Sequence, residues 1–274
     1  MKNILLVAAN SDIAKSLIDL LLNKSENKFN IFAAYRRNLP QKKEAFTPVI
    51  LDLCDDNSFF TLEEQIKNIK FDAVVNFAGV AITSPVSKLN SDDLNLQFNV
   101  STVGLARLLR FIYPHLDKNS KVINISSMAS FGVFPFISPY CAAKAAADIL
   151  LNSFEIETGI PCVSIKPGVV GTKFWQYCIN LNEGNFKNFD GEYENIGKFL
   201  LQNAKKNASK GVSPFDVAKV ILKAIEARHP KSSYLIGKDA YFASLARFIP
   251  KKFLNKIIRY TLNRRVRKSI KNEQ

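Results

Sequence analysis

The sequence predicts an α/β fold, with helices covering both faces of a parallel, doubly wound sheet of about seven strands. Short apolar runs alternate along the chain with segments of helical periodicity, which is typical of parallel sheets. The runs are continuously apolar, so both faces of each strand are expected to be buried. The 274 residues are 47% hydrophobic and 23% charged, which suits a full globular core. Ligands of such sheets bind at the carboxyl ends of the strands.

Each element follows from a local pattern. The predicted strands cover residues 3–8, 30–35, 47–51, 73–77, 121–126, 161–166 and 234–236. Helical periodicity covers residues 12–22, 58–69, 91–116 with a break, 138–158 and 214–227.

Residues 174–210 interrupt this rhythm. The stretch is rich in Asn, Gly, Lys and aromatic residues, which leaves a disordered insertion or a lid over a substrate open. Its aromatic content favours the lid. We therefore expect one domain at residues 1–240, with a lid at 174–210, and a separate tail at 241–274.

The cysteine and histidine content bounds the chemistry. The four cysteines show no CxxC spacing and the two histidines lie far apart, so we expect neither a metal site nor a disulfide framework. Reduced thiols indicate the cytoplasm. The apolar start of the chain is better explained as a buried first strand than as a signal peptide. No apolar run of about 18 residues predicts a membrane span.

Tyr140 and Lys144 form the most informative pattern in the chain. They stand four residues apart in SPYCAAKAAADILL, so a helix holds them on one face. A neighbouring ammonium favours the phenolate, which should lower the pKa of the tyrosine toward neutrality. Such a tyrosine can exchange a proton with an alcohol or carbonyl oxygen. The spacing alone also fits a solvated helix face or a packing pair.

Five motifs in a fixed order extend this pattern over residues 3–172. They are NFAG at 76–79, Asn99 in QFNVSTVG, NISS ending at Ser127, YCAAK at 140–144 and KPGVVGT at 166–172. Together they resemble the short-chain dehydrogenase/reductase family. The resemblance implies a Rossmann-type fold, a nicotinamide cofactor and a reversible interconversion of an alcohol and a carbonyl.

The resemblance also implies catalytic roles. Tyr140 would be the general acid/base, and Lys144 would lower its pKa and bind ribose hydroxyls. Ser127 would hold the substrate oxygen, and Asn99 would position a water in a proton relay. Ser126, beside Ser127, is expected to bond the backbone instead.

Structural roles remain open for three of the matched residues. Asn99 could kink or cap its helix, Asn76 could tie neighbouring strands together, and Thr172 could cap a helix.

A set of cofactor contacts follows from the same resemblance. They are Ala8, Asn10, Ser11, Asp12, Ile13, Arg36, Arg37, Asp52, Leu53, Asn76, Ala78, Gly79, Tyr140, Lys144, Pro167, Gly168, Val170 and Thr172.

The first turn departs from the family pattern. Ala8, Asp12 and Ala14 stand where the family has three glycines, in VAANSDIA. Glycine allows close approach to a pyrophosphate and tight helix–strand packing. The carboxylate of Asp12 would repel phosphate, although at a helix start it can also cap amides. The change puts the affinity for cofactor in question.

The second strand ends in AAYRRN, which indicates the cofactor type. An acid at this point accepts from the ribose 2′-hydroxyl of NAD, whereas arginine accommodates the 2′-phosphate of NADP. Arg36 and Arg37 therefore favour NADP(H) over NAD(H), and the alternative is an exposed basic turn without a ligand. Asp52, in LDLCDD, matches the family's acid near the adenine ring.

Residues 241–270 are predicted to form two helical pieces around Pro250. In the second piece an apolar residue recurs at every fourth position, at Leu254, Ile258, Leu262, Val266 and Ile270. From Arg247 to Gln274 there are ten Lys/Arg and one acid, so most of the net charge of +14 belongs to the tail. A basic amphipathic helix is typical of peripheral binding to an anionic membrane. A helix packed on the domain or on a second subunit fits equally well.

These patterns support two hypotheses. The first is an NADP(H)-dependent oxidoreductase acting on a lipophilic ketone, aldehyde or alcohol, because residues 213–237 and the tail resemble family members of the retinol and hydroxysteroid type. The second is a catalytically weak or inactive protein of the same fold, acting as an NADP(H) sensor or membrane-surface scaffold. We expect a homo-oligomer by analogy, located in the cytoplasm or at the inner face of a membrane. A nucleic-acid partner is not expected, because only the charge supports it.

Overall fold

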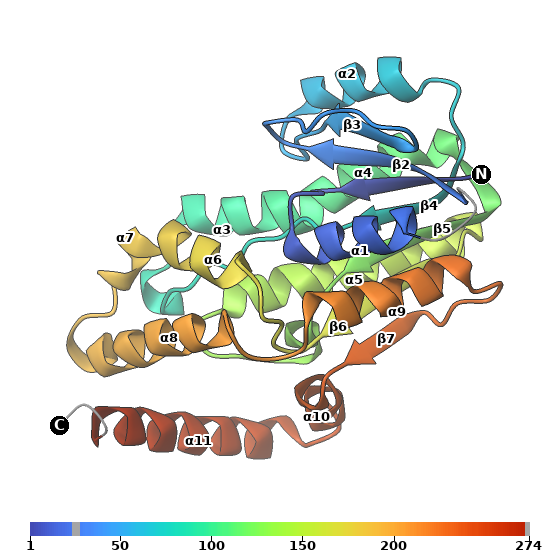
Figure 1. Cartoon of the computed structure of the whole chain (residues 1–274). Coiled ribbons are helices and arrows are strands. Elements are labelled where there is room, and N and C mark those ends of the chain that lie inside the picture. Colours follow the sequence, from blue (N-terminus) through green and yellow to red (C-terminus); the bar gives the residue numbers. More distant parts are fainter. Residues whose placement is uncertain (24–27, 272–274) are drawn as a thin grey trace.

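A seven-stranded, all-parallel sheet with strand order β3-β2-β1-β4-β5-β6-β7 forms the centre of the molecule (Figure 1). The computed structural model describes residues 1–23 and 28–271. The strands are β1 (Lys2–Val7), β2 (Phe29–Tyr35), β3 (Phe46–Ile50), β4 (Phe71–Asn76), β5 (Leu116–Ile125), β6 (Cys162–Pro167) and β7 (Ser233–Ile236). The predicted doubly wound parallel sheet is confirmed.

The central strand β1 shows why the sheet is covered on both faces. It lies between β2 and β4, and Ile4, Leu5 and Leu6 are fully buried. Ile4 and Leu6 belong to the core under α1 and α9, whereas Leu5 belongs to the core under α2, α4 and α5. A continuous apolar run is therefore needed to fill two cores at once.

Helices form a layer on each face of the sheet. They are α1 (Asp12–Leu22), α2 (Asp56–Ile66), α3 (Ser91–Phe98), α4 (Gly104–Ile112), α5 (Ser138–Thr158) and α9 (Pro214–Glu226). Figure 1 shows α1 and α9 side by side over one face, where they pack together.

The helix predicted at residues 91–116 is broken, as expected. A π-helical turn at Asn99–Val103 separates α3 from α4, and the amide of Gly104 donates to the carbonyl of Asn99. Gly104 has no room for a side chain, because a Cβ there would lie 2.9 Å from Leu53. β5 then begins at Leu116, five residues earlier than predicted.

The stretch at 174–210 is folded, so the disordered alternative does not hold. It contains α6 (Phe174–Leu181), α7 (Glu183–Phe186) and α8 (Glu194–Asn207). Its two ends are joined at the base, where Val212 N donates to Val169 O at 2.9 Å and Gly171 N donates to Val212 O at 3.1 Å. We call residues 174–210 the lid.

The tail forms two helices on either side of Pro250, α10 (Lys238–Ala246) and α11 (Lys251–Lys271). The predicted boundary at residue 240 falls inside α10. Figure 1 shows α11 running along α8, against which it packs. The apolar row Leu254, Ile258, Leu262 and Val266 is partly or fully buried, which favours the packed-helix alternative for that row. The side chain of Ile270 lies outside the described part of the chain.

Candidate active site

Ser127, Tyr140 and Lys144 meet at the carboxyl end of β5. Ser127 follows the strand and accepts from the amide of Ala129 at 3.1 Å, which caps a short 3-10 turn at Met128–Phe131. Tyr140 and Lys144 come from the first two turns of α5, and a side-chain hydrogen bond links Tyr140 to Ser127. Lys144 Nζ lies 5.9 Å from the centroid of the Tyr140 ring. The predicted set is thus brought together.

The pKa of Tyr140 departs from the prediction. Burial raises it above the ordinary value, while the hydrogen bond with Ser127 acts in the lowering direction. Lys144 Nζ donates to the carbonyl of Ile125 at 2.8 Å and lies over the ring. The expectation of a pKa lowered toward neutrality by the ammonium is therefore wrong for this structure. A raised pKa keeps the phenol protonated, which suits a proton donor.

Lys144 is buried, and burial lowers its pKa to about 8. Asp148, one helical turn further along α5, acts in the opposite direction because its negative charge favours the ammonium. Tyr140, Lys144 and Asp148 follow each other at intervals of four residues, so they line one face of the helix. That interval could have pointed to Asp148 in the sequence.

Asp148 belongs to a polar cluster that joins α5 to the Ser127 turn. Its carboxylate pairs with Lys166 Nζ at 2.5 Å, and the two side chains are only 15% and 11% exposed. The same Nζ donates to Ser130 Oγ at 3.1 Å, and Ser130 Oγ donates to the carbonyl of Ser127 at 2.9 Å. The pair therefore fixes the catalytic helix against the turn that carries the serine.

Asn99 has the structural role that the sequence left open. It begins the π-helical turn, its carbonyl accepts from Gly104, and its side chain is exposed. The water relay stays a prediction.

Asn76 also has its structural role. Its Nδ2 donates to Asn124 Oδ1 at 2.9 Å across β4 and β5, and its Oδ1 accepts from the amide of Ala78. Gly79 lies close to Lys144, since a Cβ there would be 3.2 Å from Lys144 Nζ.

The expectation for Ser126 is wrong. Its Oγ is buried and has no hydrogen-bond partner among the residues that the structure describes.

The first turn keeps a glycine-like shape without glycine. Ala8 has φ of +59°, in the left-handed region, and the amide of Ser11 donates to the carbonyl of Ala8. Ser11 caps α1 by accepting from the amide of Ala14 at 3.2 Å. Asn10 is exposed and Ile13 is partly buried.

The carboxylate of Asp12 is hydrogen-bonded to the segment that leads into the lid. Its Oδ2 accepts from the amide of Lys173 at 2.7 Å, which links the start of α1 to the start of the lid. This contact gives the carboxylate a partner, so its presence at the turn is compatible with a bound dinucleotide.

The adenine side lies beyond β2 and β3. Arg36 and Arg37 are exposed at the end of β2, where both guanidinium groups are accessible to a phosphate. Asp52 accepts from the amide of Cys54 at 2.9 Å, and Leu53 is buried against Gly104. The positive charge of Arg36 acts on the pKa of the Cys54 thiol, but burial and Asp52 raise it overall.

The segment after β6 is held by a residue that the sequence did not single out. The amide of Val169 donates to Asp239 Oδ2 at 2.7 Å, and a Cβ on Gly168 would come within 1.9 Å of that carboxylate. Pro167 ends β6, and Val170 forms a β-bridge with Val212. Thr172 is partly exposed and directly precedes Lys173.

The lid is anchored by a second missed residue, Asn182. It is buried, accepts from the amide of Thr83 at 2.7 Å and donates to the carbonyl of Ala81 at 2.7 Å. Such contacts between residues about a hundred positions apart leave no local signal in the sequence.

Aromatic side chains of the lid pack against the segment that precedes α5. The ring of Phe136 lies 5.7 Å from that of Phe189 and 5.8 Å from that of Tyr193. Phe136 has φ of +69°, which is unusual for a bulky residue, and its carbonyl accepts from the amide of Ser84 at 2.9 Å. Val133, between Ser127 and Tyr140, is 54% exposed. Aromatic and aliphatic side chains are therefore found together between the lid and the segment that precedes Tyr140.

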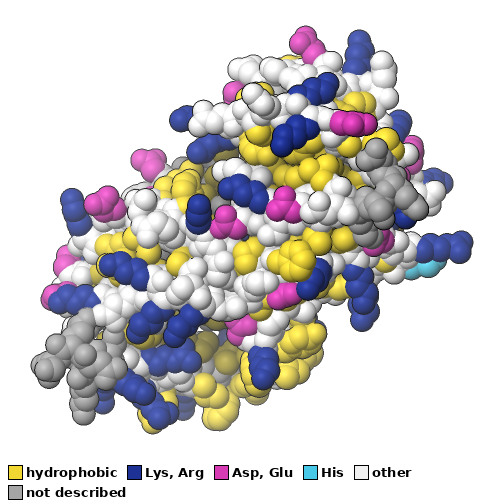
Figure 2. Space-filling model, in the orientation of Figure 1, with side chains coloured by type: hydrophobic (Ala, Val, Ile, Leu, Met, Phe, Trp, Pro, Cys, Tyr) yellow, Lys and Arg dark blue, Asp and Glu magenta, His cyan; other side chains and the backbone are white. Residues whose placement is uncertain are grey.

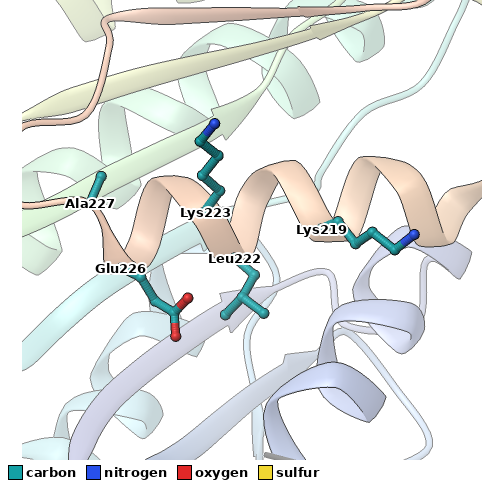
Figure 3. A pocket seen from close by; sticks show the side chains of 5 residues that line it. All are labelled: Lys219, Leu222, Lys223, Glu226 and Ala227. Carbon is teal, nitrogen blue, oxygen red and sulfur yellow. The ribbon is translucent and has the colours of Figure 1, made fainter.

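A second surface hollow lies on α9, but its side chains do not form a candidate binding site. It is lined by Lys219, Leu222, Lys223, Glu226 and Ala227 in the later part of α9. Figure 3 shows that Lys219, Lys223 and Glu226 point away from one another, so they offer no common binding point. Because α9 leads into the start of β7, this hollow lies toward the amino ends of the strands.

The described residues contain no group of three His, Cys, Asp or Glu side chains that could hold a metal ion. What the carboxyl edge does offer is a helix start, two accessible arginines and a buried lysine beside a tyrosine. These features fit a nicotinamide dinucleotide.

Comparison with known proteins identifies this arrangement. The family model for short chain dehydrogenase matches residues 4–180. The chain belongs to this family. Both the predicted resemblance and the Rossmann-type fold are confirmed.

The curated relatives are family members of similar length. A 3-amino-tetrahydro-pyrrolizinone reductase of Xenorhabdus hominickii is 27% identical over 87% of this chain and 88% of its own. An NADPH-dependent 3-dehydrocapnine reductase of Ornithobacterium rhinotracheale is 24% identical over 94% of this chain and 96% of its own. The human 17-beta-hydroxysteroid dehydrogenase type 1 is 23% identical over 84% of this chain and 76% of its own. Together they support an oxidoreductase of the short-chain type.

Solved structures agree on the fold. A short chain dehydrogenase from Burkholderia cenocepacia, in complex with NADP, superposes with a TM-score of 0.72 at 17% identity, covering 94% of this chain and 99% of its own.

Proposed function

We propose that this chain is an NADP(H)-dependent oxidoreductase that interconverts a carbonyl and an alcohol by hydride transfer. The observation that carries the proposal is the meeting of Ser127, Tyr140 and Lys144 at the carboxyl edge of the sheet, where Lys144 Nζ lies 5.9 Å from the centroid of the Tyr140 ring and Ser127 acts on the phenol. Ligands of doubly wound sheets bind at this edge. A family member without catalytic activity would have no need to keep these three side chains together.

The residues divide the chemistry between them. The bound nicotinamide supplies or accepts the hydride. Ser127 holds the substrate oxygen and polarises it by donating a hydrogen bond. Tyr140, protonated because of its raised pKa, gives its proton to that oxygen during reduction. Lys144 stabilises the resulting phenolate through its positive charge and offers donors to the ribose hydroxyls.

The cofactor proposal rests on the adenine side. Arg36 and Arg37 are exposed, and neither forms an ion pair with an acid among the described residues. A 2′-phosphate would supply the negative charge with which they could pair. One relative, the 3-dehydrocapnine reductase, is named as NADPH-dependent, which agrees with a preference for NADP(H).

The substrate proposal rests on the apolar side of the site. Val133 and the aromatic group around Phe136 present carbon surface near Tyr140. The human relative is named a hydroxysteroid dehydrogenase, and a hydroxysteroid is a lipophilic alcohol of the kind that such a surface would accept. We therefore propose a lipophilic carbonyl or alcohol as substrate.

The oligomer proposal rests on α5. Ile149 and Ile156 are 70% and 77% exposed and lie seven residues apart, on one face of the helix. A second copy would cover them.

We also propose that the protein is cytoplasmic and binds the inner face of a membrane through its tail. No helix in the described part of the chain is long and apolar enough to cross a membrane.

The test is consumption of NADPH with a panel of lipophilic carbonyls. Tyr140→Phe should lower kcat roughly a hundredfold or more while leaving NADPH affinity unchanged, because it removes only the transferable proton. Tyr113→Phe, at a 51% exposed position, is the control and should behave as the wild type. Equal rates for the two variants would refute the proposal.

A fluorescence titration with NADPH separates the enzyme from the sensor or scaffold alternative. Ala8 and Asp12 motivated that alternative. The left-handed conformation of Ala8 and the hydrogen bond between Asp12 and the amide of Lys173 argue against the sensor or scaffold alternative. Tight binding without turnover on any carbonyl would favour a sensor, and no binding would favour a scaffold.

A further inference from the structure

The outward face of the tail carries a group of exposed apolar side chains. Its members are Tyr241, Phe242, Leu245, Phe248, Phe253, Ile257 and Tyr260, which are between 40% and 73% exposed. Figure 2 shows hydrophobic side chains together with Lys and Arg at the lower edge of the molecule, where Figure 1 places α10 and α11. We call these seven residues the tail face.

The tail face differs from the apolar row that the sequence suggested. Leu254, Ile258, Leu262 and Val266 turn toward α8 and are used by packing within the domain. Phe253, Ile257 and Tyr260 follow at intervals of four and three residues on another side of α11, so they form a second row. Packing of the first row therefore leaves the second row uncovered.

The charge around the tail face is of one sign. Nine Lys or Arg and no acid lie between Arg247 and Lys268. None of these nine forms an ion pair with a residue that the structure describes. Aromatic rings beside unpaired cations match the boundary of an anionic bilayer, where rings enter the interface and cations meet headgroups.

The tail also touches the active site. α10 packs against the 3-10 turn that follows Ser127, and Arg247 lies over the ring of Phe131 at 5.8 Å. Asp239, at the start of α10, holds the amide of Val169. α11 packs against α8, and α8 against α6 of the lid. A surface bound to the tail face would therefore lie next to the lid.

We propose that the tail face docks on an anionic lipid bilayer and presents the lid side of the active site to it. A lipophilic substrate then reaches Tyr140 from the bilayer. The docking itself is independent of catalysis, whereas the delivery of substrate rests on the proposed oxidoreductase activity.

The first experiment is co-sedimentation of the full chain with vesicles, without cofactor or substrate. The wild type should bind phosphatidylcholine vesicles that contain phosphatidylglycerol and should not bind pure phosphatidylcholine. Phe248→Ser should weaken binding roughly tenfold, because it removes one aromatic anchor. Phe60→Ser on α2 is the matched control, since both rings are 73% exposed.

The charge is tested in the same assay. Lys252→Gln with Lys256→Gln should weaken binding roughly fivefold for each base removed. Lys42→Gln with Lys43→Gln, also exposed, should have no effect. Equal binding to neutral vesicles, or equal effects of the two pairs, would overturn the proposal.

Two other partners have their own signatures. If Phe248→Ser splits an oligomer in sedimentation velocity without lipid, the tail face is a subunit interface and the proposal fails. If the wild type binds duplex DNA but not anionic vesicles at the same salt concentration, the surface is a nucleic-acid site and the proposal fails.

Substrate delivery is read from steady-state kinetics. Phe248→Ser should raise KM for a carbonyl carried in anionic vesicles and leave kcat, and KM for a water-soluble carbonyl, unchanged. Unchanged KM for both carbonyls would overturn the delivery. Vesicle binding without any turnover would refute the oxidoreductase and keep the docking, whereas turnover without vesicle binding would do the reverse.

Discussion

The catalytic side of the site and the segment that faces it are held by different kinds of contact. Tyr140 and Lys144 stand on a long helix that the buried pair Asp148–Lys166 ties to the Ser127 turn. Residues 168–173 are held through single amides. Those of Val169 and Lys173 donate to the partly exposed carboxylates of Asp239 and Asp12, and those of Gly168 and Gly171 donate to backbone carbonyls of β7 and Val212. A buried ion pair is costly to break, whereas an exposed hydrogen bond exchanges readily with water. Catalytic geometry is thus fixed while the segment next to the lid can adjust.

The sharpest test of this contrast is Lys166→Met. It removes the cation that pairs with the largely buried carboxylate of Asp148 and leaves only the hydrogen bond from Ser164 Oγ at 2.8 Å, which should lower the free energy of unfolding by about 3 kcal/mol. Lys219→Met breaks an exposed pair with Asp216 and should change the free energy of unfolding far less, because water and salt screen such a pair. Chemical denaturation measures both. Similar losses in the two variants would show that the catalytic side is not specially braced.

Adding Asp148→Leu to Lys166→Met should recover most of the lost stability, because no unpaired charge remains. A double variant as unstable as the single one would assign the loss to packing.

Gly168→Ala is expected to have the next largest effect. The added Cβ would collide with the Asp239 carboxylate at 1.9 Å, so α10 or the segment must move, at a cost of about 1–3 kcal/mol. Gly132→Ala is the control, because no atom lies within 4 Å of its Cβ. Thermal unfolding and NADPH titration measure the change. Asp239→Ala in the same chain should relieve the collision, and failure to do so would place the strain elsewhere.

Asp148→Asn should change the pH profile of reduction. Asp148 favours the ammonium of Lys144, whose pKa is about 8, so its loss should lower that pKa further. If the ammonium form is the active one, kcat/KM falls as pH rises through the pKa. The alkaline fall should therefore occur at lower pH in the variant. Glu157→Gln, an exposed acid on the same helix, should leave the profile unchanged.

The smallest effect is expected from Asp12→Asn. The amide oxygen can still accept from Lys173 while the negative charge near the phosphates is removed, so NADPH should bind up to about fivefold more tightly. Asp12→Ala should lose the tie and raise KM for substrate. Asp19→Asn, exposed on α1, is the control. Weaker NADPH binding by Asp12→Asn would mean that the carboxylate itself supports the turn.

Local patterns predicted the sheet, the helices that cover it and the pairing of Tyr140 with Lys144, while the family resemblance placed Ser127 beside them. Continuous apolar runs mark strands buried on both faces, and the four-residue interval places two side chains on one helix face. The strand ends differ by a few residues, most clearly at β5, because pairing with β4 at Phe71 extends that strand.

Other features depend on contacts that local patterns do not contain. Asp12 meets Lys173 across 161 residues, and Asn182 meets Thr83 across 99. The direction of the pKa shift of Tyr140 was not predictable from the spacing, because burial of the phenol raises the pKa and burial is a property of the folded chain.

The joined base of the lid has a consequence for protein engineering. Hydrogen bonds between Val212 and residues 169 and 171 bring the two ends of the insertion together whatever lies between them. The entropic cost of closing a loop grows slowly with its length, so inserts of other sizes should be tolerated at this junction. The lid can thus be treated as a replaceable cassette, with which substrate range could be altered by grafting while the hydride-transfer machinery stays untouched.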